Sequence, residues 1–278
     1  VRQGDEPAAR ERLDWTSALI GLGLMILPVI ALLTWREPSP VTGQWPLRVM
    51  SYNLHSAFDV TGKLDLEAVA RTIEFEQPDV VALQEVSRGW VLSGSVDMLT
   101  WLSQRLGMPF VWGPTADPLW GNAILSRYPV IDVKYFGMPN NDVVRPTRGY
   151  LMVTIQAGDD PLRVIATHLH HVEADGALRV PQVQAILDTW AGQPATVIAG
   201  DLNATPDAPE MALMIGVGLR DAFLQSEAGG DGFTYASNRP YQRIDYIYLS
   251  PDLIVRGFHV NDSTASDHKG IAATIDLR

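Results

Sequence analysis

From residue 47 to its C-terminus, the chain alternates short apolar runs, rich in β-branched residues, with segments of helical or turn character. Runs of this length and composition predict β-strands, and eight of them are more than a single small sheet accommodates. The pattern therefore predicts more than one sheet. The eight runs are LRVMSYNL, DVVALQEV, GNAILSRY, YLMVTIQA, LRVIATHL, ATVIAGDL, RIDYIYL and GIAATIDL.

Three segments between these runs have the periodicity of amphipathic helices: residues 65–77, about 95–106 and about 178–191. Asp65 can cap the first of them, and Gln77-Pro78 ends it. Helices that cover the outer faces of two packed sheets form a layered α/β sandwich. With 278 residues and no internal repeats, we expect a single large domain over residues 47–278.

The N-terminal part has a different character. Residues 15–35 carry no charge and are bracketed by tryptophans, which predicts a single transmembrane helix, kinked at Pro28, after a flank at 1–14. A cleaved signal peptide and a buried core helix are the rival interpretations. Residues 36–46 hold three prolines and predict a short, stiff linker. More arginines precede the apolar run than follow it closely, so we expect the domain that follows to lie on the extracytoplasmic side. A single span also fits a chain truncated at its N-terminus.

Charge and composition restrict the kinds of molecule that the protein is expected to bind. The net charge is -11, and residues 47–278 alone hold 17 Lys and Arg against 27 Asp and Glu. A surface of this sign repels a phosphate backbone, so nucleic acid is not an expected partner. A metal-dependent enzyme can still be acidic, because its cations supply the local positive charge. The absence of cysteine excludes disulfides, thiolate metal sites and cysteine nucleophiles.

Strand after strand ends in a residue able to hold metal or phosphate. Each such residue has an ordinary explanation by itself: Asp and Asn favour turns, a lone histidine is often a core residue, and acids pair with nearby bases. Their joint occurrence indicates a site, because hard cations bind clustered carboxylate and amide oxygens and hydrolysis also uses histidine. The residues are Asn53, Glu85, His168, Asp201, Asn203, Asp245, Asp267 and His268.

In their order along the chain, seven motifs resemble the endonuclease/exonuclease/phosphatase superfamily of metal-dependent phosphodiesterases and phosphomonoesterases. They are SYNLH, LQEV, GNAILSRYP, THLHH, GDLNATP, RIDYIYLS and SDHKGI. The resemblance implies a four-layered, DNase I-like α/β sandwich with the site at one edge. The segment from HSAFDV to LSRYP is most similar to membrane-attached members such as the C-terminal domain of Cwh43-type proteins.

The resemblance also implies a role for each matching residue. Glu85 is the expected principal Mg²⁺ ligand, with Asn53 and Asp267 at the same or an adjacent metal position and Mn²⁺ as the alternative ion. Asp201 orients or deprotonates the attacking water, and Asn203 holds a phosphate oxygen. His268, oriented by Asp245, stabilises the phosphorane or transfers a proton. His168 donates to the phosphate or the leaving group, and it argues against the abasic-site nuclease branch. His55 and Asn122 are the further substrate-binding candidates.

These expectations combine into a membrane-anchored, Mg²⁺-dependent phosphoesterase acting on a phospholipid head group or a small phosphodiester. Such chemistry is physically reasonable, because a divalent cation neutralises the anionic phosphate while carboxylates position water. The first alternative is a membrane-tethered nuclease, and the second is a catalytically silent binding module. No protein partner is predicted.

Overall fold

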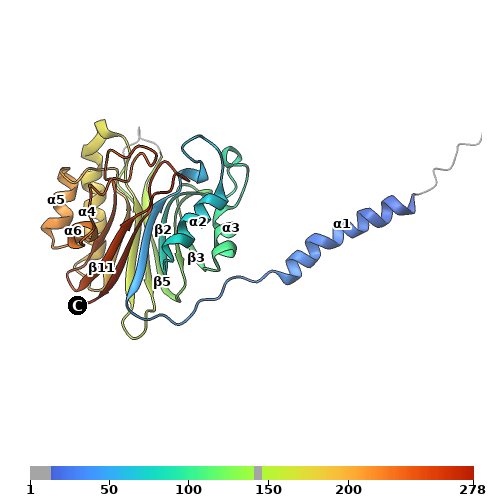
Figure 1. Cartoon of the computed structure of the whole chain (residues 1–278), viewed down its shortest axis with the longest axis horizontal. Coiled ribbons are helices and arrows are strands. Elements are labelled where there is room, and N and C mark those ends of the chain that lie inside the picture. The colour runs from blue at the N-terminus through green and yellow to red at the C-terminus, as the bar shows by residue number, and fades with distance from the viewer. Residues whose placement is uncertain (1–13, 141–145) are drawn as a thin grey trace, which may run out of the picture. The chain divides into compact units, whose positions relative to one another are not determined.

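The computed structural model describes residues 14–140 and 146–278, so the predicted flank 1–14 lies outside the described residues except for Asp14. The chain divides into two compact units, residues 1–37 and 38–278. The first contains helix α1 (Trp15–Thr34), whose first turn is capped by the Asp14 carboxylate, which accepts from Thr16 N at 3.0 Å (Figure 1). With a mean hydropathy of 2.3, α1 is long and apolar enough to cross a membrane, a test that a signal sequence also passes.

The second unit is built on two six-stranded sheets. The first sheet has the order β11-β12-β1-β2-β4-β3 and the second β5-β6-β7-β8-β10-β9. The strands of the first sheet are β1 (Leu47–Asn53), β2 (Val80–Ser87), β3 (Phe110–Asp117), β4 (Trp120–Ser126), β11 (Leu253–Val260) and β12 (Ile271–Leu277). Those of the second are β5 (Val130–Gly137), β6 (Gly149–Ile155), β7 (Leu162–His168), β8 (Thr196–Asp201), β9 (Arg220–Asp221) and β10 (Asp245–Leu249).

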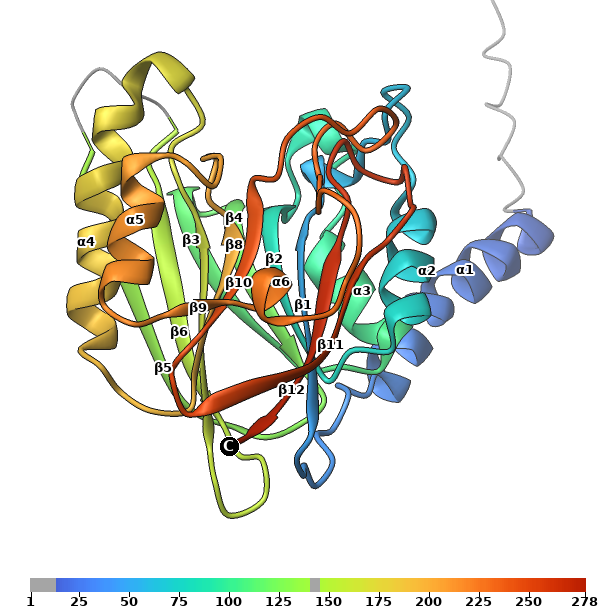
Figure 2. The same ribbon diagram turned by 60° about the vertical axis from the view of Figure 1, so that its left-hand side comes forward.

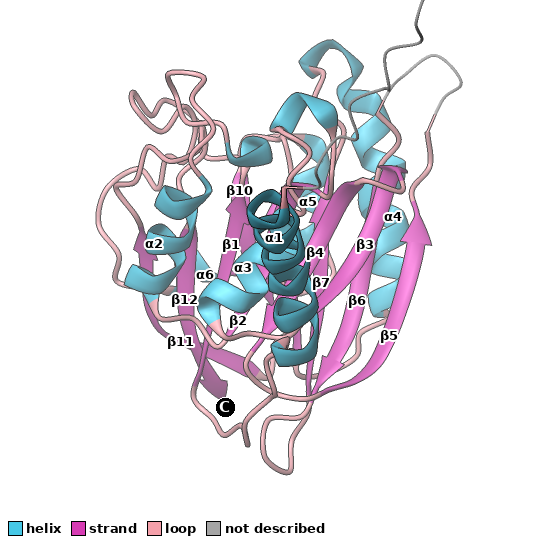
Figure 3. Ribbon diagram, turned by 90° about the vertical axis from the view of Figure 1, so that its right-hand side faces the viewer, coloured by secondary structure: helices cyan, strands magenta, loops and turns pink. Residues whose placement is uncertain are grey.

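Helices cover the outer faces of both sheets, which gives the predicted four-layered sandwich (Figures 2 and 3). Two of them, α2 (Leu66–Glu76) and α3 (Met98–Leu106), pack on the first sheet. The other two, α4 (Arg179–Trp190) and α5 (Pro209–Gly216), pack on the second. The shorter elements are α6 (Ala222–Gln225) and the 3₁₀ turns η1 (His55–Ala57), η2 (Val91–Ser93) and η3 (Glu173–Leu178).

The central strands read as continuous apolar runs because both of their faces are buried. In β1, Val49 points into the core between the two sheets, whereas Met50 and Tyr52 point into the core under α2 and α3. In β2 the same alternation sends Ala82 to the central core and Leu83 to the outer one. The central core thus consists mainly of aliphatic side chains from both sheets.

Part of the segment assigned to the linker packs on the second unit. Val41 N donates to the Arg127 carbonyl at 2.7 Å, and the Trp45 indole donates to the Asp160 carbonyl at 3.0 Å. Arg127 directly follows β4, and Trp45 precedes β1 by one residue. These contacts therefore lie at the start of β1, the end opposite to Asn53.

Strand directions bring the polar strand ends to one edge of the sandwich. Strands β1 and β2 are parallel, as are β7 and β8, so all four end on the same side. Strands β12 and β10 run antiparallel to β1 and β8 and therefore begin there; Asp245 pairs directly with Asp201. This edge collects the predicted site residues from both sheets.

Candidate active site

Asp201 lies at the centre of the site, at the end of β8, and is 1% exposed. Its carboxylate accepts from Asn53 Nδ2 at 3.0 Å and from Asn203 N at 2.9 Å, and it lies 3.3 Å from His168 Nε2 and 3.6 Å from His268 Nε2. Burial opposes ionisation, but the two imidazoles and the donated hydrogen bonds outweigh it and hold the pKa of Asp201 well below its ordinary value. Asp201 is therefore an ionised acceptor among four donors at neutral pH.

The glycine before Asp201 is required by the close approach of β7. A Cβ on Gly200 would stand 2.0 Å from the Thr167 carbonyl oxygen, nearer than any side chain tolerates. The parallel pairing of these strands places His168 directly beside Asp201. At the end of β8, Gly200 thus allows the close packing of the two strands, and the adjacent Asp201 provides the functional carboxylate.

His268 forms a buried pair with Asp245. Its Nδ1 lies 2.9 Å from Asp245 Oδ2, and its Nε2 points toward Asp201. Burial disfavours the imidazolium, but the carboxylates of Asp245 and Asp201 overcome this and raise the pKa of His268 to about 10. His268 is therefore a cationic donor at neutral pH, and Asp245 fixes its orientation.

This raised pKa predicts a loss of stability in alkaline solution. The pKa of His268 is about 10 in the folded state against 6.5 in the unfolded chain, so its contribution is complete below pH 6.5 and disappears as the pH rises through 10. Between pH 7 and 10, in EDTA, we expect the free energy of unfolding to fall on the order of 3 kcal/mol more in the wild type than in His268→Gln. Denaturant titrations of both proteins measure this difference, and equal pH dependence would contradict the assignment.

His168 is held from behind by Arg148, which the sequence did not single out. Arg148 is buried, stacks with its guanidinium 5.4 Å from the Trp120 ring centre, and donates from Nη1 to His168 Nδ1 at 2.9 Å. A guanidinium can only donate, so Nδ1 is the acceptor and Nε2 carries the proton. The protonated Nε2 faces Asp201 at 3.3 Å and Glu85 at 3.9 Å. His168 is thus a neutral donor, in contrast to His268.

Glu85 reaches the site through an irregularity in β2. The register with β4 shifts between Leu83 and Val86, and Glu85 has a φ of 53°, in the left-handed region that a non-glycine residue rarely adopts. Backbone strain of this kind is concentrated at functional sites. The bulge leaves the Glu85 carboxylate partly exposed, and among the described residues it accepts no hydrogen bond.

Glu85 and Asp267 are the carboxylates that fit a divalent cation. Both are about one quarter exposed and line the same cavity. Among the described residues, the Asp267 carboxylate approaches Ser266 Oγ at 3.3 Å and His55 Nδ1 at 3.6 Å, which leaves its oxygens available. Mg²⁺ binds through one or two carboxylates and retains several waters, which matches this donor set.

A second group within the described residues also has the composition of a metal site. Ligand atoms of Asp201, Asp245 and His268 all lie within 4.8 Å of one another. However, His268 Nδ1 already bonds Asp245 Oδ2, and the Asp201 carboxylate already faces Asn53 and His168, although Asp245 Oδ1 has no partner among the described residues. This group is therefore better suited to proton positioning than to holding a hydrated cation.

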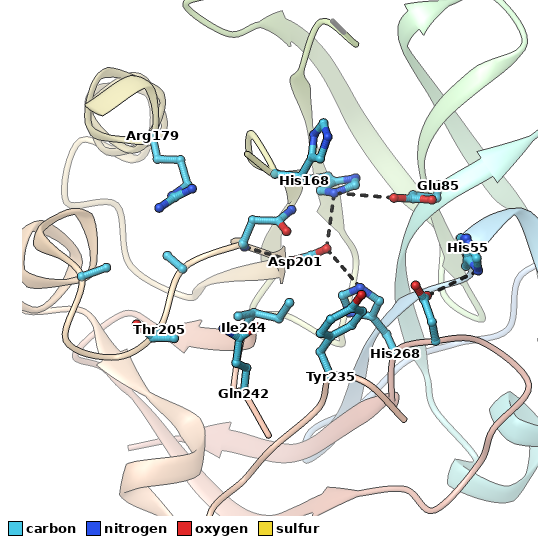
Figure 4. Close-up of a pocket in the computed structure, with 15 residues that line it drawn as sticks. His55, Glu85, His168, Arg179, Asp201, Thr205, Tyr235, Gln242, Ile244 and His268 are labelled. Carbon is cyan, nitrogen blue, oxygen red and sulfur yellow. Dashed lines mark hydrogen bonds and ion pairs between the residues drawn. The ribbon is translucent and has the colours of Figure 1, made fainter. Parts of the chain in front are cut away.

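The site residues surround a cavity of about 400 Å³ (Figure 4). At one end are Glu85 from β2 and His55 and Asp267 from segments that adjoin the first sheet, in the middle are His168, Asp201 and His268, and at the other end are residues from loops and helices that adjoin the second sheet. The residues at this far end are His171, Arg179, Asn203, Ala204, Thr205, Ala208, Gln242 and Ile244, and Tyr235 stands beside His268.

The structure brings together all but one of the predicted site residues. Asn53 lies beneath the cavity, where its Nδ2 bonds Asp201 and its Oδ1 accepts from His55 N. Asn203 has a φ of 48° and donates from Nδ2 to the Leu169 carbonyl, which leaves a second amide hydrogen for a ligand. Asn122, in contrast, is 1% exposed and does not line the cavity, because its Nδ2 donates to the Gly149 carbonyl and so links the two sheets.

Two side chains that contact the site histidines, Arg148 and Tyr235, were missed by the sequence reasoning. Arg148 directly precedes β6, and a basic residue next to a strand is ordinary in a sequence. Only its burial in the structure reveals its role. Tyr235 belongs to a loop without regular secondary structure and reaches His268 through an isolated bridge. No periodic or compositional signal in the sequence identifies such a contact.

Comparison with known proteins places this geometry in a family. The model of the endonuclease/exonuclease/phosphatase family matches residues 50–268, which include every site residue described above. The chain belongs to this family. The superfamily resemblance seen in the sequence motifs is thereby confirmed, and the fold expected from it is the one observed; the narrower likeness to Cwh43-type proteins stays a prediction.

Individual relatives agree with the assignment. This chain is 25% identical to YbhP of Escherichia coli K12 over 234 residues, which are 75% of this chain and 86% of YbhP. It is 36% identical to human sphingomyelin phosphodiesterase 3 over 79 residues, which are 26% of this chain and 12% of that protein. The crystal structure of an endonuclease/exonuclease/phosphatase from Beutenbergia cavernae is 28% identical, covers 83% of this chain and 71% of its own, and superposes with a TM-score of 0.71.

Proposed function

We propose that this family member is a metal-dependent phosphodiesterase that hydrolyses a phospholipid head group or a small phosphodiester. The observation that carries the proposal is the arrangement around Asp201. An ionised buried carboxylate lies between a neutral and a cationic histidine, and two further carboxylates face the same cavity. Such a site offers a water acceptor, phosphate donors and cation ligands within one cavity.

The chain's own residues would divide the reaction as follows. Asp201 accepts a hydrogen bond from the attacking water and orients it. His268 and the protonated Nε2 of His168 donate to phosphate oxygens as negative charge develops there, and Asn203 Nδ2 adds a third donor. Glu85 and Asp267, with the Asn53 amide oxygen behind them, would hold Mg²⁺ or Mn²⁺. When bound, the ion neutralises the phosphate and polarises it toward attack.

The proposed location is a membrane, with α1 as a single-pass anchor and the catalytic domain on the extracytoplasmic side. The length and hydropathy of α1 support an anchor, and the arginine-rich flank, which lies outside the described residues, supports the orientation. The acidic net charge disfavours nucleic acid as substrate. The nuclease and the silent binding module therefore rank below a phosphodiesterase acting on lipid or small molecules.

Hydrolysis of bis(p-nitrophenyl) phosphate by the full chain in detergent micelles tests the proposal. We expect turnover that requires Mg²⁺ or Mn²⁺ and stops in EDTA, because the anionic ester repels the nucleophile without a cation. Phosphatidylglycerol vesicles, glycerophosphodiesters and plasmid DNA should then be compared at physiological salt. A folded protein inert toward all of them would favour the binding module, and cleavage of DNA alone would favour the nuclease.

A further inference from the structure

The end of the cavity away from Glu85 and Asp267 forms a distinct compartment, which we call the alcohol lobe. It is formed by residues of the loops and helices that adjoin the second sheet: His171, Arg179, Asn203, Ala204, Thr205, Ala208, Gln242 and Ile244. Figure 4 shows Arg179 on the far side of Asp201 from Glu85 and His55. A phosphate bound at Asp201 therefore directs one of its two ester groups toward this lobe.

The lobe contains an arginine, yet among the described residues a carboxylate compensates its charge. Arg179, the first residue of α4, bonds through Nε to the carboxylate of Glu210 on α5, and both side chains are buried. The remaining Arg179 contacts are the carbonyls of His170 and Val172, each 3.4 Å from Nη1. A buried carboxylate at this distance compensates the guanidinium charge, so a ligand in the lobe meets a neutral pair.

The other titratable group of the lobe is also uncharged. Burial and the nearby Arg148 guanidinium lower the pKa of His171, whose Nδ1 lies 3.3 Å from Arg148 Nη2. The lobe thus differs from a site for a second phosphate, which is typically lined by arginine or lysine side chains free to form charge-assisted hydrogen bonds.

The neutral groups of the lobe suit hydroxyl groups. The Thr205 hydroxyl donates to Asp207 at 2.6 Å and can still accept, and the Asn203 amide oxygen is an acceptor whose nitrogen is tied to Leu169. Gln242 adds a half-buried amide with both a donor and an acceptor. Ala204 and Ala208 contribute only methyl groups and keep the lobe open.

We propose that the alcohol lobe binds an uncharged, hydroxylated alcohol group of the substrate, such as a glycerol or a cyclitol, and rejects groups that carry a second phosphate. This inference rests on the proposed function and narrows its substrate class. The same alcohol can come from a soluble glycerophosphodiester or from a lipid head group. Glu210 is the residue that sets the preference, because it neutralises Arg179.

Binding of a matched pair of ligands tests the lobe without turnover. Glycerophosphoinositol and glycerophosphoinositol 4-phosphate differ only in the second phosphate. In calorimetric titrations of the full-length Asp201→Asn variant in detergent, we expect the unphosphorylated compound to bind at least about tenfold more tightly. Tighter binding of the 4-phosphate would overturn the proposal.

Glu210→Gln then tests the cause. Glutamine keeps an oxygen for Arg179 Nε and removes the negative charge, so the uncompensated guanidinium should attract the second phosphate. We expect the ratio of kcat/KM for the 4-phosphate to that for glycerophosphoinositol to rise roughly 20-fold, the scale of one unit charge acting over roughly 8–10 Å at an effective dielectric constant of about 20. An unchanged ratio in a folded variant would contradict the role of Glu210.

Ala208→Leu provides a second variant, which keeps the test decisive where Glu210→Gln fails to fold. The larger side chain fills the lobe, so hydrolysis of glycerophosphoinositol should fall at least about tenfold more than hydrolysis of methyl p-nitrophenyl phosphate. Equal losses would show that the alcohol binds elsewhere. Parallel assays on phosphatidylinositol vesicles show whether the alcohol group belongs to a lipid head group or to a soluble glycerophosphodiester. Absence of any metal-dependent turnover would refute the proposed function. The binding titrations would still show whether the alcohol lobe prefers the unphosphorylated ligand.

Discussion

Replacement of Asp201 by asparagine is expected to lower kcat roughly 10²–10⁴-fold, the usual contribution of a positioned acid or base. The reason is geometric as well as electrostatic. The carboxylate accepts from Asn53 and Asn203 and lies beside two protonated imidazole nitrogens, and an amide in its place would direct a donor at one of these donors. The water would lose its ionised acceptor, so kcat should fall while KM changes little.

Steady-state kinetics of the full chain on bis(p-nitrophenyl) phosphate measure this loss, with thermal unfolding as a check of folding. Asp188→Asn is the matched control, because Asp188 is exposed on α4 and bonds only Gln184 in the same helix. Its activity should equal that of the wild type. A fully active Asp201→Asn enzyme would remove Asp201 from the chemistry.

Replacement of Glu85 by glutamine is expected to weaken the binding of Mn²⁺ by more than about 100-fold and to abolish turnover at ordinary metal concentrations. Loss of an outer-shell partner alone typically weakens metal binding roughly 10–100-fold, and a direct carboxylate ligand contributes more. The bulge in β2 presents this side chain to the cavity without any competing hydrogen bond among the described residues, so the variant should keep its fold. Titration calorimetry with Mn²⁺ and activity as a function of metal concentration measure both effects.

Glu74→Gln is the control here, since Glu74 lies on the surface of α2 and pairs only with the partly exposed Arg105. The Asp201, Asp245 and His268 group supplies the competing hypothesis. If that group held the ion, Asp245→Asn would abolish metal binding and Glu85→Gln would not. Measuring the two variants side by side separates the two locations.

The part of the fold that the sequence predicts well is its centre. The eight predicted runs all form strands, and the three amphipathic segments form α2, α3 and α4 within three residues of the expected bounds. Their signals are strong because each central strand is buried on both faces and each helix on one. Strands β3, β5, β9 and β11 were not predicted; they are the edge strands of the two sheets, and β9 is only two residues long, whereas the mixed side chains of the other three form no apolar run.

Candidate residues were predictable where they stand at a strand terminus, His168 and Asp201 at the ends of β7 and β8 and Asp245 at the start of β10, because strand direction alone then decides which edge they reach. The environment of Asn122, which lies inside β4, could not be predicted in this way. This residue belongs to a recognisable motif in β4, yet it points between the sheets to the Gly149 carbonyl. A motif reports that a residue type is needed at a position, and the packing of the second sheet determines what it contacts.

By itself, the sequence determined the residue types, their order along the chain and the alternation of strands and helices, since these depend on local periodicity. Only the tertiary structure decided the electrostatics of the site. Arg148 makes His168 a neutral donor, Asp245 and Asp201 make His268 a cation, and Glu210 neutralises Arg179 in the alcohol lobe. Each of these effects joins residues at least twenty positions apart in the chain, and charge interactions act over distances in space that chain position does not record.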